Sequence, residues 1–194
     1  MSSLKSWDDL FYAIETNIDL RSFDSLISNM AKQRATFIKD LKRKAPKKGE
    51  FYDQYIDYIA DEDFALEKSE HISYQLAIIG LSISLEIVMR NIIIHRFKPN
   101  KNIIDSLFKF KELIKFLTSK QIFISGIQNY KEYNELRCIN NCLKHSGIVD
   151  KQLTSANSKW HLEKSFDGGQ LKDAYERLKN PACLFIKLLV KEIK

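Results

Sequence analysis

The sequence has few of the residues that interrupt helices, with three prolines and six glycines among 194 residues. It also lacks the sustained alternation of apolar and polar residues that is typical of a half-buried β-strand. With 44% hydrophobic and 29% charged residues, it has the composition of a chain that buries a core rather than that of a disordered one. These features predict an all-α fold, a bundle of long helices that forms a single domain over residues 1–194.

Cysteine is scarce as well. Cys138, Cys142 and Cys183 are an odd and sparse set, which does not suit a secreted disulfide scaffold and favours a reducing compartment. The N-terminal "MSSLKSWDDLFYAIE" has no basic start followed by an apolar run, so we expect no signal peptide. The protein is therefore expected to be cytoplasmic.

Several motifs of common enzyme classes are missing. The chain has no Gly-rich phosphate loop, no HExxH and no GxSxG. It therefore lacks the motifs that would indicate a nucleoside triphosphatase, a zinc protease or an esterase. Cys138, Cys142 and His145 share a helix face, but a helical CxxxC followed by His is not the usual CxxC spacing of zinc sites. We expect no metal and no cofactor.

The most apolar segment is "LAIIGLSISLEIVMRNIII", residues 76–94. It has nearly the length of a membrane span, yet Glu86, Arg90 and Asn91 lie in its second half, so we interpret it as a core helix rather than a membrane helix. From about residue 71 to 96, apolar residues would occupy almost every side of the predicted helix. That pattern is typical of a central helix enclosed by neighbouring helices or by a second subunit.

The remaining helices are predicted from spacing and end signals. Ser6 is suited to cap a first helix, and Pro46 ends a second helix that begins near Phe23. Residues 51–71 predict a further helix with a break near Asp61. We expect helices over about 170–194, broken at Pro181. The residues expected to face the core are Trp7, Leu10, Phe11, Ile14 and Ile18 in the first helix, and Leu26, Met30, Phe37 and Leu41 in the second.

The net charge of +6 is unevenly distributed. Residues 39–48 hold six basic residues against one acidic, and residues 50–70 hold eight acidic against one basic. Residues 96–131 carry eight Lys or Arg against Asp105 and Glu112. This last stretch is compatible with a polyanionic ligand such as RNA, or it is simply a lysine-rich surface in contact with water.

The segment "YNELRCINNCLKHSGIVD", residues 133–150, combines an apolar and a polar helix face. We expect a helix over about 127–146. At about 100° per residue, Leu136, Ile139 and Leu143 fall within one narrow sector and are expected to face the core. The opposite face carries a polar stripe at three- and four-residue spacing. Its members are Tyr130, Asn134, Arg137, Asn141 and His145, with Lys144 at the border.

This set of side chains is suited to the cleavage of a phosphodiester bond. Imidazole takes a proton from a 2′-hydroxyl near neutral pH, guanidinium neutralises the charge that grows on the phosphoryl oxygens, and a carboxamide orients either group. RNA is favoured over DNA because the nucleophile is the substrate's own 2′-hydroxyl. In the alternative interpretation, Arg137, Asn141 and His145 are only exposed polar residues, with His145 and Lys144 near the negative end of the helix.

The helical bundle together with "ELRCINNCLKHSG" resembles the HEPN superfamily (higher eukaryotes and prokaryotes nucleotide-binding). Its nuclease members carry an RNxxxH or, more loosely, Rx4–6H motif. The resemblance implies a metal-independent ribonuclease of a toxin–antitoxin, abortive-infection or other antiphage system. It further implies a homodimer in which two motifs share one composite cleft, and it is compatible with an antitoxin or other defence-system partner protein.

Asn141 and His145 match the NxxxH part of that motif. Asn140 stands where the arginine is expected, and Arg137 lies one helical turn earlier on the same face as Asn141. Some members of the family carry an ExxxR-like pair on the neighbouring helix. Glu86 and Arg90 have this spacing, so Arg90 is a candidate for the missing guanidinium. The pair is equally well explained as an internal ion pair or as a contact in a dimer interface.

A second segment, "RNIIIH", matches the written motif literally through Arg90, Asn91 and His95. It lies inside the apolar helix, and we favour the later segment because its polar face is continuous. The leading hypothesis is thus a dimeric ribonuclease in which His145 is the general acid or base, Arg137, with help from Arg90, stabilises the phosphorane, and Asn141 orients them. The alternatives are a HEPN-like module without activity that binds RNA, a nucleotide or a protein, and a purely structural helical dimer.

Overall fold

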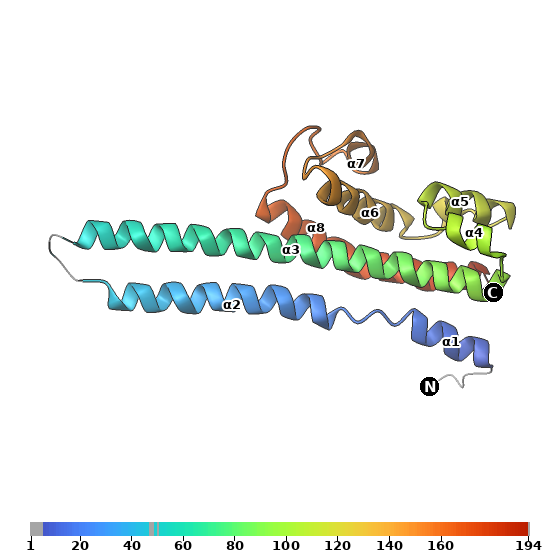
Figure 1. The fold of residues 1–194 in the computed structure, drawn as a ribbon, viewed down its shortest axis with the longest axis horizontal. Coiled ribbons are helices and arrows are strands. Elements are labelled where there is room, and N and C mark those ends of the chain that lie inside the picture. Colours follow the sequence, from blue (N-terminus) through green and yellow to red (C-terminus); the bar gives the residue numbers. More distant parts are fainter. Residues whose placement is uncertain (1–5, 47–48, 50, 194) are drawn as a thin grey trace.

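The computed structural model describes residues 6–46, 49 and 51–193, and these residues form an all-α structure (Figure 1). The only extended pairing in this part of the chain is a single bridge between Ile148 and Ser165. The all-α prediction is therefore confirmed. The helices are α1 (Trp7–Glu15), α2 (Arg21–Lys44), α3 (Tyr52–Phe97), α4 (Lys101–Ser106), α5 (Phe110–Ser119), the 3-10 turn η1 (Ile124–Gly126), α6 (Tyr130–His145), α7 (Lys151–Ala156) and α8 (Gly168–Ile193).

Helix α3 is the axis of the fold. Its 46 residues span about 70 Å at 1.5 Å per residue. Helix α8 packs along its second half, α6 lies beside both, and α2 runs back along α3 from the opposite direction (Figure 1). The core lies between α3, α6 and α8, where Leu85, Met89, Leu136 and Phe185 have no exposed surface. These contacts fix the orientation of α6.

The first half of α3 and the second half of α2 extend as a two-helix arm beyond the other helices (Figure 1). A small separate cluster of Ile38, Leu41 and Ile59 joins them. Arg34 adds ion pairs from α2 to Asp63 at 2.7 Å and to Glu70 at 3.2 Å. The acidic stretch of α3 is thus partly neutralised by a basic side chain of α2.

Two predicted helix breaks are wrong. The chain continues as one helix through Asp61, since no proline or glycine interrupts residues 52–79 and α2 packs alongside. It also continues through Pro181 in α8. Proline has no N–H to donate to the carbonyl of Arg177. The flanking Leu178 and Ala182 are nevertheless fully buried, and this packing holds the helix together.

The predicted N-cap Ser6 and the predicted end of α6 are confirmed, whereas several predicted core positions of α1 and α2 are wrong. The Ser6 hydroxyl accepts a hydrogen bond from the Asp9 amide at 3.2 Å, as an N-cap should, and α6 ends within one residue of the predicted position. The predicted core positions Trp7 and Ile14 are exposed, and Tyr12 is buried instead. In α2 the prediction is right for Leu41. It is wrong for Leu26 and Phe37, which are exposed, because α3 covers α2 along a line that runs through Ile27 and Ile38.

Candidate functional site

The candidate site lies on α6, whose apolar side packs on α3 and α8. Leu136 and Ile139 have no exposed surface, as predicted, and Leu143 is half-buried. On the opposite side Arg137 and Asn141 are half-buried and His145 is exposed. The three polar residues therefore occupy the more accessible side of the helix and follow one another at intervals of one turn. At 1.5 Å per residue, Arg137 and His145 stand about 12 Å apart along the axis.

Neighbouring side chains hold Arg137 in place. Its Nε and Nη2 donate hydrogen bonds to Oδ1 of Asn134 at 3.2 and 2.9 Å, and its guanidinium lies 4.2 Å from the centre of the Phe110 ring. A cation over an aromatic ring is attracted by the ring's negative face. Phe110 begins α5, so the first turn of α5 helps to position this arginine.

Glu86 and Arg90 of α3 lie near the same end of α6 and line one small pocket with Phe110. Arg90 lies 4.3 Å from the centre of the exposed Phe108 ring. Among the ion pairs of the described residues, Glu86 and Arg90 are not joined, so this predicted ion pair is not found. Both side chains are only half-buried, which leaves them accessible to water instead.

Tyr133 shows that these charges are neighbours. Burial raises the pKa of its hydroxyl most, and the nearby Glu86 carboxylate raises it further, whereas Arg137 and Arg90 lower it. The Tyr133 hydroxyl is buried without a hydrogen-bond partner. Charged groups of α3 and α6 thus lie close enough to this tyrosine to shift its pKa. The structure brings Glu86 and Arg90 near Arg137 rather than near His145, whereas Lys144 is exposed next to His145.

The literal motif Arg90, Asn91 and His95 does not converge. Asn91 donates a hydrogen bond to Glu15 Oε2 at 2.9 Å, and His95 Nε2 lies 2.9 Å from Asp8 Oδ1 with its ring stacked on Phe11 of α1. Arg90 faces Phe108 instead. Asn91 and His95 therefore attach α1 to α3.

Asn140, which stands at the arginine position of the family motif, has no exposed surface. Its Oδ1 and Nδ2 are buried without a hydrogen-bond partner. A side chain at this position faces the core and cannot reach a substrate on the polar side of α6. Arg137 and His145 are 80° apart around the helix axis, against 140° for positions 140 and 145. Arg137 thus lies nearer than position 140 to the face of α6 that carries His145.

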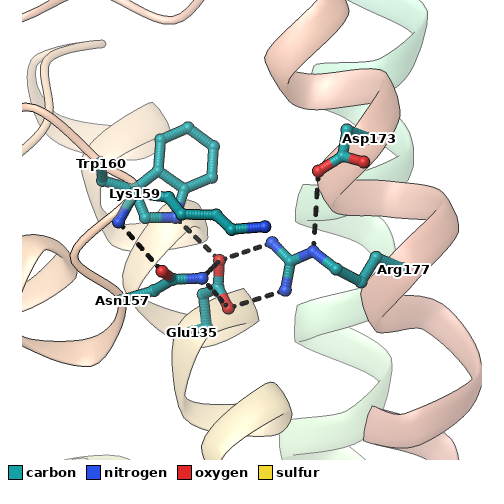
Figure 2. A network of polar contacts seen from close by, with 6 residues as sticks. All are labelled: Glu135, Asn157, Lys159, Trp160, Asp173 and Arg177. Carbon is teal, nitrogen blue, oxygen red and sulfur yellow. Dashed lines mark hydrogen bonds and ion pairs between the residues drawn. The ribbon is translucent and has the colours of Figure 1, made fainter.

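A polar network that sequence reasoning missed fixes the other side of α6 (Figure 2). Glu135 is nearly fully buried. Its carboxylate accepts two hydrogen bonds from Arg177 of α8, at 2.7 and 2.9 Å. It accepts a further one from Trp160 Nε1 at 2.8 Å and two from Asn157 Nδ2 at 3.0 Å. Asn157 also accepts from the Lys159 amide, and Asp173 pairs with Arg177 at 3.6 Å. The feature of the sequence that could have revealed this network is Glu135, a carboxylate next to the predicted core residue Leu136.

This network ties the loop after α7 to two helices. Burial alone would raise the pKa of Glu135, but the hydrogen bonds from Arg177, Trp160 and Asn157 together outweigh burial and lower that pKa. The carboxylate is thus held in its charged form. Because all its contacts are within the protein, Glu135 positions α6 and does not face a substrate.

The cysteines of α6 lie on its covered side. Cys138 and Cys142 are buried, and burial raises the pKa of the Cys142 thiol to about 11, whereas His145 is exposed. Among the described residues, no group of three His, Cys, Asp or Glu side chains is placed to hold a metal ion.

Comparisons with protein families, with curated proteins and with solved structures find no match for this chain. One helix of the described residues, α3, is long and apolar enough to cross a membrane by length and composition, with 44% of its most apolar window buried inside the protein. The core helix of a soluble protein meets the same criterion. What the structure defines is an all-α protein with a polar, accessible face on α6.

Proposed function

We propose that this protein is a HEPN-like, metal-independent RNA endonuclease that acts as a dimer in the cytoplasm. The observation that carries the proposal is the shared accessible side of α6, where Arg137, Asn141 and His145 follow one another opposite the buried Leu136 and Ile139. Phosphate-binding, orienting and proton-transferring groups are thereby arranged along one line.

The charge around Arg137 supports RNA as the substrate. Every lysine of residues 96–131 is exposed, and this stretch includes α4 and α5, of which α5 contacts Arg137 of α6 through Phe110. Exposed lysines attract a phosphate backbone without regard to sequence. The side chains involved are Lys98, Lys101, Lys109, Lys111, Lys115, Lys120 and Lys131.

In the proposed reaction His145 accepts the proton of a ribose 2′-hydroxyl, whose oxygen attacks the adjacent phosphorus. The bond from phosphorus to the 5′-oxygen breaks, and that oxygen receives the proton that His145 accepted, so the products are a 2′,3′-cyclic phosphate and a 5′-hydroxyl. Arg137, assisted by Arg90, stabilises the extra negative charge on the phosphorane. Asn141, between them in sequence, orients the phosphate and the imidazole.

The distance between Arg137 and His145 supports a dimer. In one chain the two residues are about 12 Å apart along the helix, too far to hold one phosphate closely. They lie four positions on either side of Asn141. A second copy of α6 running in the opposite direction would therefore bring its His145 beside this Arg137.

A second function, a HEPN-like module without activity that binds RNA, a nucleotide or a protein, is favoured by two observations. The Arg137 guanidinium already engages Asn134 and Phe110, and Asn140 is buried where the family has its arginine. Under either function, a protein partner such as an antitoxin would cover the same side of α6.

The test is an RNA cleavage assay in EDTA with the wild-type protein and the variants His145→Ala, Arg137→Ala and His161→Ala. His161 is exposed and lies outside α6, so His161→Ala is the matched control. We expect cleavage that leaves 2′,3′-cyclic ends, is lost in His145→Ala and is strongly reduced in Arg137→Ala. RNA binding without cleavage by the wild type would establish the binding module. Loss of cleavage in His95→Ala but not in His145→Ala would move the site to the other motif.

A further inference from the structure

The outer side of α3 carries an apolar stripe that the rest of the chain leaves uncovered. Ile72, Leu76, Ile83 and Ile87 are 51, 52, 38 and 43% exposed, and they lie within 60° of one another around the helix axis. Ile79, half-buried, lies 20° beyond the edge of this sector, next to Ile72. We call these five residues the α3 stripe.

The stripe is the uncovered part of the most hydrophobic segment of the chain. Residues 72–85 contain no charged side chain. Helices α2 and α6 pack on the flanks of α3 and α8 packs on its far side, whereas the outer side remains open (Figure 1). An apolar surface of this kind, bordered by polar residues, marks an interaction site in a soluble protein. The neighbouring helices therefore cover only part of the apolar surface of α3.

We propose that the α3 stripe binds the α3 stripe of a second copy of the chain, with the two helices antiparallel. The proposal does not rest on cleavage of RNA, although a dimer is part of the proposed function.

The spacing of the stripe argues for a second copy as its partner. From Ile72 the exposed residues follow at intervals of four, seven and four, so the pattern reads the same from either end. Its midpoint falls between Ile79 and Gly80. A two-fold interface requires such a self-complementary surface, because residue i meets residue j and j meets i. In the antiparallel pair Ile72 would meet Ile87, and Leu76 would meet Ile83.

The dimensions also fit. The stripe is about 22 Å long, which is four turns of helix and enough for a row of interdigitating side chains. Its exposed side chains supply several hundred Å² of apolar surface to the centre of an interface, to which one partner contributes about 800 Å² in total. The adjoining surfaces of α2 and α6 would supply the polar rim. Beyond Ile87, the side chain of Arg90 with Phe108 over it closes the stripe at that end.

The first experiment measures mass in solution. We expect a dimer at tens of micromolar for the wild type, and a monomer with unchanged helical circular dichroism for Leu76→Glu and for Ile83→Glu. Leu184→Glu is the matched control, because Leu184 is exposed to a similar degree on α8, outside the stripe. This variant should remain dimeric. A monomeric wild type overturns the proposal, and so does a dimer that survives Leu76→Glu and Ile83→Glu.

The second experiment tests the antiparallel direction by oxidative cross-linking of introduced cysteines. Ile79→Cys lies at the proposed axis and should form a disulfide between two copies. Ile72→Cys should not cross-link alone, because its two copies would lie about 22 Å apart, but it should cross-link when mixed with Ile87→Cys. Rapid cross-linking of Ile72→Cys alone would show a parallel pair and overturn the proposal.

A third measurement separates a protein partner from a lipid surface. Wild-type protein is sedimented with phosphatidylcholine–phosphatidylserine vesicles. Absence from the vesicle pellet, together with dimer formation, supports the proposal. Recovery of a monomer on the vesicles, lost in Leu76→Glu, would assign the stripe to the membrane instead. None of these results depends on cleavage, so failure of the RNA assay would not affect them.

Discussion

Arg177 and Glu135 are joined by two short hydrogen bonds, from Nη2 to Oε1 at 2.7 Å and from Nη1 to Oε2 at 2.9 Å. The pair connects α8 to Glu135 on the covered side of α6 (Figure 2). Trp160 and Asn157 donate further hydrogen bonds to the Glu135 carboxylate. The accessible side of α6 is thus oriented by contacts on its covered side.

Removal of either member of this pair should destabilise the fold. Glu135→Ala leaves a partly buried guanidinium without its partner, and we expect the free energy of unfolding to fall by roughly 2–4 kcal/mol. Chemical denaturation measures this change. Arg21→Ala is the control, because Arg21 pairs with Asp19 on the surface and should have little effect. Equal effects of the two substitutions would contradict the structural role of Glu135.

The same carboxylate predicts a pH dependence of stability. The pKa of Glu135 is lower in the folded state than in the unfolded chain. Its stabilising contribution is therefore fully present above the unfolded value of about 4.3 and is lost as the pH falls through the folded value. Denaturation of wild type and Glu135→Gln between pH 7 and pH 3 should show the difference between them shrinking in the acidic range. A difference that stays constant over this range would rule out this linkage.

Gly80 allows α2 to approach α3. A Cβ atom at this position would lie 2.6 Å from Cε1 of Phe23. Gly80→Ala should destabilise the protein by about 1 kcal/mol, because the overlap outweighs the better helix propensity of alanine. In a Phe23→Ala background the same substitution should be stabilising by up to about 1 kcal/mol. A double-mutant cycle on thermal or denaturant unfolding measures this change of sign, which a purely local effect of glycine would not produce.

Asn140 is a buried amide without hydrogen-bond partners. Asn140→Leu keeps nearly the same shape and removes the cost of burying two unpaired polar groups, so we expect a gain of about 1–3 kcal/mol in the free energy of unfolding. Asn141→Leu, on the half-buried side of α6, should give no such gain. If Asn140→Leu instead destabilised the protein, the amide would have a partner in solution.

Phe110 should matter for activity through Arg137. Phe110→Leu keeps an apolar side chain at the start of α5 but removes the ring under the guanidinium, a contact worth about 0.5–1 kcal/mol. Under the proposed function we expect a two- to five-fold loss in the rate of RNA cleavage, much smaller than the loss in Arg137→Ala. An unchanged rate would show that the ring does not position Arg137.

Much of the local structure could be predicted from residues alone. Scarce proline and glycine indicated helices, Ser6 indicated a helix start, and the positions of Leu136 and Ile139 indicated which side of α6 is buried. The same periodicity placed Arg137, Asn141 and His145 on the opposite side. These features depend on backbone geometry and on neighbours within a few residues, which the sequence contains in full.

The tertiary structure decided what depends on distant neighbours. Packing along α2 and α8 carried the helices through Asp61 and Pro181, where local signals predicted breaks. Contacts with α1 engaged Asn91 and His95, although their spacing matched a nuclease motif. The partners of Glu135 come from residues 22 to 42 positions away. A periodic pattern shows that a helix has a covered side, but which element covers it, and which polar groups find partners there, depends on long-range contacts.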